Sequence, residues 1–325
     1  MINRRRLIRL SAVTMLAPAL GGRTAYAQAW PSRFVRLIVP FTQGGPTDFV
    51  ARLVAERLTK GLGVQVVIEN RGGAGTNIGA ELVARANPDG YTVLVGTSAL
   101  AINRNLYRTL AYDAATDLAP VSLMVLLPFF MFVPNSSPAR SVAEFVAFAK
   151  ANRNKVKFGS PGTGTPPHLA GELLKQLAGI EMIHVPYRGA SDALNDLIPG
   201  RIDLFFASGA TLEQAHAGQI RSLAVSSARR DDAAPELPAI AETIPGFDVT
   251  SWYALFVPAK TPPQIIEKLS VDTVTALADP AVKGKLEQLG YTVAASTPDE
   301  LGVQLKWEIG KWSTVIKAAG LGVSE

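Results

Sequence analysis

Two glycine-rich loops precede helix-like segments in this sequence, and each has the composition of an anion-binding site. One lies in "KFGSPGTGTPPHLAGEL" (157–173), where a strand-like run is followed by glycines, by Thr165 and by two prolines. The other, "FTQGGPTDFVAR" (41–52), has the same order of strand, glycines, proline and helix. Glycine lets the main chain approach a ligand, and N–H groups at a helix N-terminus attract anions. The two loops together predict a site for a small carboxylate.

The spacing of the glycines argues against a nucleotide site. A dinucleotide loop needs G-x-G-x-x-G and a P-loop needs G-x-x-x-x-G-K-[ST], whereas prolines and no lysine follow Gly164. A third glycine-rich run, "ENRGGAGTNIGAE" (69–81), also lacks that spacing, and we interpret it as a structural turn. The alternative for the two ligand loops is that each is only a tight strand-to-helix connection.

Side chains in these turns could serve either a ligand or the local fold. Asp48 could hold an ammonium or hydroxyl group, but an acid in a first turn also complements the helix dipole. His168 could donate to a carboxylate or satisfy local backbone groups, and Arg188 is a cation at a turn where arginines are commonly solvated. Further polar or glycine positions follow other strand-like runs: Thr97, Ser98, Asn103, Tyr187 and Gly189.

Catalytic and metal-binding patterns are not found in this sequence. It contains no cysteine, and its three histidines have no H-E-x-x-H or other ligand spacing, so we expect neither a metal nor a cofactor. No G-x-S-x-G elbow occurs. Binding without turnover is therefore the simpler interpretation, and the alternative is an α/β enzyme with His168 or Asp48 as general base.

The N-terminus has the pattern of a cleavable export signal, residues 1–27. A basic start, an apolar middle and Ala25-Tyr26-Ala27 favour export through either the Sec or the twin-arginine route, with a membrane anchor as the alternative. That segment holds five arginines and no acid, so its removal leaves 27 basic residues against 27 acidic ones. A near-neutral mature protein gives no support for nucleic-acid binding.

The remaining sequence alternates strand-like and helix-like segments, which predicts an α/β fold with parallel strands covered on both faces. In the first part, strands are expected at 35–41, 64–71 and 91–97 and helices at 47–63 and from 76 to Pro88. The second part has expected strands at 128–134, 155–160, 181–187, 201–208 and 220–227, with helices at 141–151, 166–178 and 190–198. A strand at 251–258 and helices at 262–278, 280–289 and 298–319 follow.

Two connections near 119–127 and 228–250 divide this pattern into two α/β lobes with a ligand cleft between them. We expect residues 28–123 and 247–325 to form lobe 1 and residues 124–246 to form lobe 2. With few covalent restraints between the lobes, we expect them to close on a ligand that touches both.

Long motifs in this chain resemble the Bug receptors, the extracytoplasmic solute-binding proteins of tripartite tricarboxylate transporters. They include "WPSRFVRLIVPFTQGGPTDFVARLVAERL", "VVIENRGGAGTNIGAELVARANPDGYTVLVGT", "FGSPGTGTPPHLAGELL", "HVPYRGASDALNDLIPGRIDLFFAS" and "LGYTVAASTPDELGVQLKWEIGKW". The resemblance covers nearly the whole mature chain. It implies a periplasmic-binding-protein-like fold, a periplasmic location, a small carboxylate or related solute as ligand, and membrane permease subunits as partners.

The resemblance also implies which residues bind the ligand, largely through backbone N–H groups, hydroxyls and ordered water. In lobe 1 these are Phe41, Thr42, Gln43, Gly44, Gly45, Asp48, Thr97, Ser98, Ala99 and Asn103. In lobe 2 they are Ser160, Gly162, Thr163, Gly164, Thr165, His168, Tyr187, Arg188, Gly189 and Asp203. We expect a monomer that delivers a solute to a permease, with presentation of the ligand to a sensor protein as the weaker alternative.

This sequence departs from the family pattern at a few positions. The family usually has proline where Gly72 stands, glycine where Thr76 stands and lysine where Arg188 stands. The first two departures affect a turn that we expect to lie away from the carboxylate loops, whereas the third could alter ligand choice. Gln43 and Pro46 occupy positions that vary among such receptors and are candidates for tuning specificity.

Overall fold

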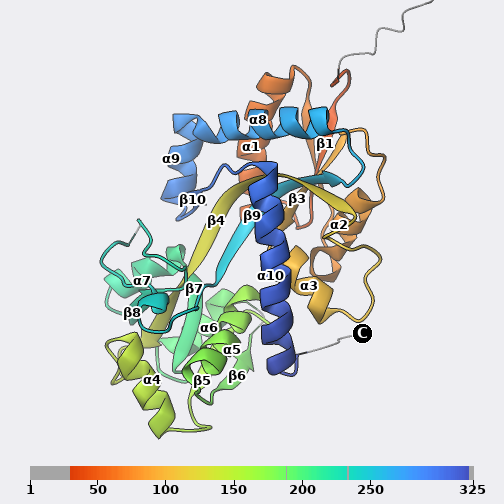
Figure 1. The fold of residues 1–325 in the computed structure, drawn as a ribbon. Helices are drawn as coiled ribbons and strands as arrows, with labels where there is room; N and C mark the ends of the chain where they lie inside the picture. Colours follow the sequence, from red (N-terminus) through yellow and green to blue (C-terminus); the bar gives the residue numbers. More distant parts are fainter. Residues whose placement is uncertain (1–29, 188, 233, 322–325) are drawn as a thin grey trace, which may run out of the picture. The chain divides into compact units, whose positions relative to one another are not determined.

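The computed structural model describes residues 30–187, 189–232 and 234–321 (Figure 1). The expected export signal (1–27) and Arg188 lie outside these ranges. Parallel strands form the first part of the sheet: β1 (Val35–Val39) lies between β2 (Val66–Asn70) and β3 (Thr92–Thr97). Beyond β3 the strands are antiparallel, in the order β9 (Thr250–Pro258), β4 (Leu118–Pro134), with β10 (Thr292–Val293) paired to β4.

The second part of the sheet continues from the other half of β4. Antiparallel to β4 run β7 (Leu204–Ser208) and β8 (Ile220–Val225). Parallel to β7 run β5 (Lys157–Ser160) and then β6 (Ile183–Pro186). The resulting order is β2-β1-β3-β9-β4-β7-β5-β6, so the sheet is mixed and the expectation of a parallel sheet is wrong at its middle strands.

The long strand β4 explains that difference. Residues 119–127, which we expected to be a connection, belong to this 17-residue strand, and it pairs with β9 before Phe129 and with β7 and β8 after it. Its prolines suggested interruptions, because proline cannot donate to a ladder. The register shifts between Pro120 and Ser122 and between Leu123 and Val125 accommodate the irregularity within one strand.

The expected helices are present with small changes in their ends. They are α1 (Pro46–Leu62), α2 (Asn77–Ala84), α4 (Val142–Ala151), α5 (Pro166–Ala178), α6 (Ala190–Leu197), α8 (Pro263–Ala278), α9 (Pro280–Gln288) and α10 (Pro298–Ala318). Elements that we did not expect are α3 (Ala99–Leu106), α7 (Leu212–His216) and the 3₁₀ turns η1 (Ala74–Thr76), η2 (Gly209–Thr211) and η3 (Ile240–Glu242).

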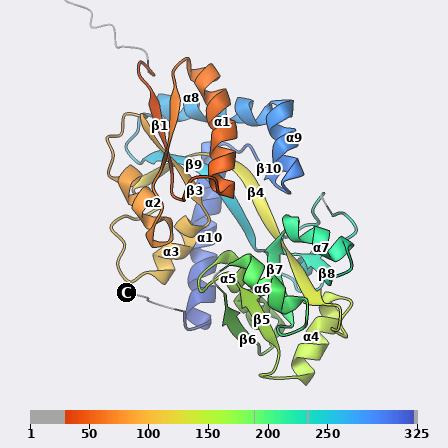
Figure 2. The same cartoon turned by 180° about the vertical axis from the view of Figure 1, so that it is seen from behind.

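The helices pack against both parts of the sheet. α1 contacts β1, β2 and α8, and α2 contacts β1 and β3, whereas α5 and α6 contact β5 and β7 (Figure 2). α10 contacts α3, β4 and α5, so one helix touches elements from both parts (Figure 1). In the described part of the chain, no helix combines the length and apolar character that a membrane span requires.

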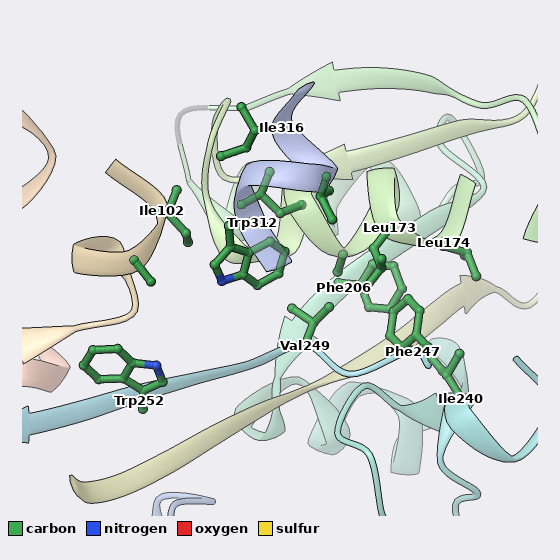
Figure 3. Packing of buried hydrophobic residues seen from close by; sticks show 14 of the residues in the cluster. Ile102, Leu173, Leu174, Phe206, Ile240, Phe247, Val249, Trp252, Trp312 and Ile316 are labelled. Atoms are coloured by element: carbon green, nitrogen blue, oxygen red, sulfur yellow. The ribbon is translucent and has the colours of Figure 1, made fainter. Parts of the chain in front are cut away.

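A continuous apolar core lies beneath α10. Trp252 on β9 and Trp312 on α10 are fully buried and belong to one cluster with Phe206 and Phe247 (Figure 3). Glu308 on α10 is also buried, and it accepts hydrogen bonds from the Trp252 indole at 2.8 Å and from the Trp312 indole at 3.4 Å. This carboxyl therefore ties α10 to β9, the neighbour of β4 in the sheet.

Candidate functional site

A cavity of about 690 Å³ opens where the loops after β1, β3 and β5 come together. Its wall is formed by Phe41, Thr42, Gly45, Pro46, Thr47, Gly75, Thr76, Thr97, Ser98, Ala99, Ile102, Asn103, Leu106, Tyr107, Pro161, Thr163, Gly164, Thr165, Pro166, Ser251 and Tyr253. These loops follow the carboxyl ends of parallel strands, which is where ligands of open α/β sheets bind. The two glycine-rich loops singled out in the sequence therefore lie in one wall.

The N-terminus of α1 presents free amides at this cavity. Gly45 is its N-cap and Pro46 its first residue, so the helix begins with a residue that has no N–H to lose. Among the described residues, the amides of Gly45, Thr47 and Asp48 have no hydrogen-bond acceptor. Free amides and the positive end of the helix dipole together favour an anionic group here.

The N-terminus of α5 presents fewer donors than its sequence suggests. Thr165 is the N-cap, but Pro166 and Pro167 occupy the next two positions and carry no N–H. The Gly164 amide is already used, because it donates to Nδ1 of His168 at 2.9 Å. The Thr165 hydroxyl is used as well, because it donates to the Gly162 carbonyl at 2.7 Å. The two helix ends are thus unequal, and α1 supplies most of the backbone donors.

Two separate features favour glycine at Gly164. Its φ of +78° lies in the left-handed region, and an added Cβ would clash with Cδ2 of Leu106 on α3. By contrast, Gly45 has a φ of −79°, and an added Cβ there would meet only the Thr42 carbonyl oxygen at 3.7 Å. The loop before α5 therefore packs closely on α3, whereas the loop before α1 has room for a side chain.

Hydroxyl and amide groups of the wall are mostly engaged with one another. Ser98 Oγ lies 2.9 Å from Ser251 Oγ, and the Ala99 amide donates to Thr97 Oγ1 at 3.2 Å. Asn103 donates through Nδ2 to the Gly75 carbonyl at 2.7 Å. These bonds fix the shape of the polar side of the cavity.

The remainder of the wall is apolar or aromatic. Phe41, Ile102, Leu106 and Tyr253 contribute much of it, and burial raises the pKa of the Tyr253 phenol, so this group is neutral at physiological pH. None of the described wall residues carries a charge. A site of this kind recognises an anion through dipoles and hydroxyls, and it accepts an organic body alongside the anionic group.

Asp48 lies behind the α1 end of the cavity rather than in its wall. It accepts from the Gly44 amide at 2.9 Å, from Arg52 Nε at 2.8 Å and from Asn70 Nδ2 at 2.9 Å. Burial alone would raise the pKa of Asp48, but the hydrogen bonds from Arg52, the Gly44 amide and Asn70 lower it below its usual value. The carboxylate is thus ionised and fully occupied in holding the first glycine-rich loop.

His168 has a comparable structural role behind the second loop. Its Nδ1 accepts from Gly164, and its ring stacks on His184 with centroids 3.7 Å apart. The imidazole of His184 is in turn 2.6 Å from Ser160 Oγ through Nε2. Burial, with a contribution from His184, lowers the pKa of His168 to about 3, and burial lowers that of His184 to about 4. Neither ring is a useful general base at neutral pH.

Several other predicted ligand residues also lie outside the wall. The set comprises Gln43, Gly44, Ser160, Gly162, Tyr187, Gly189 and Asp203. Tyr187 donates its hydroxyl to Asp196 at 2.8 Å. Asp203 accepts from the Lys157 amide at 2.8 Å, and it precedes β7 at the end of the strand opposite to the cavity.

The wall residues that sequence reasoning missed include Ile102, Leu106 and Tyr107 at α3, and further residues on β9 and in η1. Ser251 and Tyr253 lie on β9, where Tyr253 is the antiparallel partner of Thr97, a pairing that no local pattern reveals. Gly75 and Thr76 belong to the run that we interpreted as a turn away from the carboxylate loops. That interpretation is wrong, because the turn folds back against α3 and reaches the cavity.

The described side chains were searched for groups that could ligate a metal ion. Within residues 30–187, 189–232 and 234–321, no group of three or more histidine, aspartate or glutamate side chains could hold a metal ion.

The sequence and fold of this chain are similar to those of one family of transport receptors. The family model described as "Tripartite tricarboxylate transporter family receptor" matches residues 50–321. The solved structure of the periplasmic binding protein BugD is 34% identical, with a TM-score of 0.73 over 91% of this chain and 100% of BugD. Rpa4515 of R. palustris, solved with adipate, is 37% identical, with a TM-score of 0.76 over 91% and 100% of the two chains. MatC (Rpa3494) of Rhodopseudomonas palustris, with bound malate, is 31% identical, with a TM-score of 0.70 over 88% and 99%.

The α/β fold and the uncharged cavity at its strand ends define a solute-binding protein of the periplasmic type. Because the family model and these relatives match most of its length, the chain belongs to the tripartite tricarboxylate transporter receptors, the TctC/Bug family. This is a family of binding proteins, so the chain is a receptor and the alternative of an α/β enzyme is set aside.

Proposed function

We propose that this receptor captures a small organic carboxylate in the 690 Å³ cavity and delivers it to membrane permease subunits of a tripartite tricarboxylate-type transporter. The observation that carries the proposal is the N-terminus of α1, where Gly45 and Thr47 line the cavity with amides that are unpaired among the described residues, in a described wall that has no charged side chain. A carboxylate satisfies several N–H donors at once and is stabilised by the helix dipole.

The proposed ligand-binding residues are those of the predicted set that lie in the wall. They are Phe41, Thr42, Gly45, Thr97, Ser98, Ala99, Asn103, Thr163, Gly164 and Thr165. To these we add Thr47, because its free amide lies beside that of Gly45. Gly44, Asp48, Ser160 and His168 support these residues through hydrogen bonds.

The ligands of two relatives support the same chemistry. Rpa4515 was solved with adipate and MatC with malate, both dicarboxylates of four to six carbons. Cavities of some 300 to 1,000 Å³ are typical of small-molecule sites, so a ligand of this size fits the volume found here.

Two lobes joined at β4 and β9 are the proposed mechanical basis of capture. Residues 28–123 and 247–325 form lobe 1 in this proposal, and residues 124–246 form lobe 2. The wall draws α3 from lobe 1 and the loop before α5 from lobe 2, so a ligand would touch both. We further propose export by cleavage after residue 27, which mass measurement of the mature protein tests directly.

The binding proposal is tested by thermal unfolding and calorimetric titration of the purified receptor with mono- and dicarboxylates. A ligand that binds only the folded state raises the midpoint of unfolding once its concentration exceeds Kd. We expect at least one carboxylate to do so, while the corresponding amides and alcohols do not. If uncharged analogues bind as well as acids, a carboxylate receptor is the wrong description.

Delivery to a permease needs a separate measurement. We expect the ligand-loaded receptor to stimulate solute uptake into vesicles that contain the membrane subunits, and the unloaded receptor to leave uptake unchanged. Uptake at the same rate without the receptor would contradict a transport role and leave presentation to a sensor protein as the next hypothesis.

A further inference from the structure

Thr76 is a cavity-wall residue whose hydroxyl is left without a partner. Its side chain is 7% exposed, and Oγ1 is buried with no hydrogen-bond partner among the described residues. A buried hydroxyl that makes no hydrogen bond has lost its bonds to water without replacement, which destabilises the unliganded protein. Such a group in a binding cavity indicates a bond that forms when the cavity is filled.

Other wall hydroxyls differ from that of Thr76 in this respect. Ser98 and Ser251 pair with each other, and Thr165 donates to the Gly162 carbonyl. Thr97 accepts from the Ala99 amide. Among the described wall residues, Thr76 is thus the one whose hydroxyl is both buried and unpaired.

The backbone conformation at Thr76 is a second source of strain, in addition to the unpaired hydroxyl. Ala74, Gly75 and Thr76 have φ angles of +46°, +61° and +84°, and a β-branched residue rarely adopts the left-handed region. Glycine is the residue that this conformation favours. A threonine held here against its own preference is a strained position of the kind found at ligand clamps.

Buried polar contacts hold this strained turn in place. Asn103 donates to the Gly75 carbonyl at 2.7 Å and to Asn77 Oδ1 at 2.8 Å, and the Tyr112 hydroxyl donates to the same Asn77 oxygen at 3.0 Å. The Thr76 amide donates to the Gly73 carbonyl at 3.0 Å. The turn is thus anchored on both sides, so Thr76 is presented in a defined position.

We propose that Thr76 determines ligand specificity by donating its hydroxyl to an oxygen of a second polar group on the ligand. The proposal rests on the carboxylate-binding function proposed above, in which the first carboxylate lies at the α1 end. A 120° rotation about the Cα–Cβ bond moves Oγ1 into another staggered position without any backbone change, so the hydroxyl can turn to meet a ligand oxygen. The preferred ligands are then acids with a carboxylate, oxo or hydroxyl group at the other end.

The neighbourhood of Thr76 agrees with this class of ligand. Tyr107 is a wall residue of the same region, and its hydroxyl lies close to Gly75, 2.6 Å from where a Cβ would be built. A hydroxyl-bearing side chain close to the turn that carries Thr76 offers a second donor to the same oxygen acceptor. An alkyl or phenyl end would leave the buried Thr76 hydroxyl unpaired in the complex as well.

Calorimetric titrations of the wild-type receptor and of Thr76→Val test this inference. Valine keeps the shape and β-branching of threonine and removes the hydroxyl. The probes are adipate, 6-hydroxyhexanoate and hexanoate, which share one carboxylate and a six-carbon chain. We expect Thr76→Val to weaken adipate or 6-hydroxyhexanoate by about 5- to 100-fold, the range of one hydrogen bond, and to leave hexanoate within about twofold. If adipate is the ligand that loses affinity, the group bound by Thr76 is a carboxylate, and if it is 6-hydroxyhexanoate, that group is a hydroxyl.

Thr76→Ser is the matched control, because it keeps the hydroxyl and drops only the β-methyl. It should bind adipate as the wild type does, and its own unfolding midpoint shows that the turn is intact. Should Thr76→Val not fold, the comparison of Thr76→Ala with Thr76→Ser gives the same contrast.

The outcomes separate this inference from the proposed function. A wild-type receptor that binds carboxylates while Thr76→Val weakens all three probes equally, or none, overturns the role of Thr76 and leaves the proposed function standing. A wild-type receptor that prefers hexanoate to both other probes overturns the proposed ligand class. Binding of no carboxylate at all overturns the proposed function, and the inference with it.

Discussion

The Gly45 amide can be tested in isolation because its backbone already has the geometry of proline. Its φ is −79°, close to the value that proline imposes, and its N–H has no partner among the described residues. We expect Gly45→Pro to fold and to lose about 5- to 100-fold in carboxylate affinity through the missing donor. Calorimetric titration measures this loss.

Gly45→Ala is the control for that experiment, because it adds a side-chain carbon and retains the N–H. Its Cβ would meet only the Thr42 oxygen at an ordinary distance of 3.7 Å. Alanine should therefore bind nearly as the wild type does. Equal affinities for the proline and alanine variants would mean that this amide does not contact the ligand.

Gly164 and Gly44 form a second matched pair. Both have positive φ angles, +78° and +83°, but an added Cβ at Gly164 would clash with Leu106, whereas no atom of the described residues lies within 4 Å of one added at Gly44. Each alanine variant should lose about 1–2 kcal/mol of unfolding free energy from left-handed strain. Gly164→Ala should lose more, and it should lose less when it is introduced into a Leu106→Ala background than into the wild type. Denaturant unfolding of the wild type, the three single variants and the double variant would reveal whether the close approach of α3 is present in solution.

At the residue scale, the sequence predicted loops better than side chains. Helix-end physics and glycine content pointed to Gly45 and Gly164, and both lie in the wall. Asp48 and His168 were predicted to contact the ligand because of their side-chain chemistry. In the structure Asp48 accepts a hydrogen bond from Asn70, and His168 stacks on His184. Spacing along the chain cannot show such partners, since they come from other strands.

At the scale of elements, stacked His168 and His184 join α5 to β6 and make stability depend on pH. Burial lowers their pKa values from the ordinary 6.5 to about 3 and about 4, so both rings are neutral in the folded protein near pH 5. The unfolded chain takes up protons below about pH 6.5, and the folded protein does not. Stability should therefore be highest above pH 6.5 and fall as pH decreases toward 4, by up to about 1.4 kcal/mol per pH unit for each histidine.

Denaturant unfolding between pH 7 and pH 5 measures this slope, in a window above the usual carboxylate titrations. His184→Gln should reduce the slope by removing one of the two protonation events. A wild-type protein whose stability does not change across this window would mean that neither ring is held neutral by burial.

The helix α10 is attached to β9 through one buried carboxyl. Glu308 accepts from Trp252 on β9 and from Gln304 and Trp312 on its own helix, and burial raises its pKa. Glu308→Ala should cost about 2–4 kcal/mol of unfolding free energy, because it leaves a cavity and unpaired indole N–H groups. Glu308→Gln retains one acceptor oxygen and should cost clearly less. Chemical denaturation gives both values, and equal losses would contradict the role of the hydrogen bonds.

Element prediction was accurate where a segment has one strong periodicity. α5 was predicted with the ends that the structure has, since its prolines and Gly179 mark them. α3 was missed because two asparagines interrupt a short apolar pattern. The first half of β4 was taken for a connection because of Pro120 and Pro128, although its pairing with β9 tolerates both.

At the scale of the whole molecule, local alternation predicted an α/β fold but could not order the strands. The central pair β4 and β9 is antiparallel and joins segments that lie more than a hundred residues apart. No helical crossover precedes such a pair, so the sequence gives no local signal for it. The position of the cavity follows from this order, because it brings Tyr253 beside Thr97 and α10 beside α3 and α5.

The proposed hinge at β4 and β9 predicts that the lobes approach each other on binding. The wall joins α3 to the loop before α5, so a ligand that contacts both stabilises the closed arrangement over the open one. The sequence has no cysteine, so two introduced cysteines can carry spin labels without background. Ile78 on α2 and Leu177 on α5 are 50% and 40% exposed and belong to different proposed lobes.

We expect saturating ligand to shorten and narrow the distance distribution between labels at Ile78→Cys and Leu177→Cys, measured by double electron–electron resonance. Labels at Ile78→Cys and Val67→Cys lie within lobe 1, and Val67 is 44% exposed, so this pair serves as the control and should not change. An unchanged distribution across the lobes, in a sample whose binding is confirmed by titration, would mean that β4 and β9 form a rigid connection and that the ligand enters a preformed cavity.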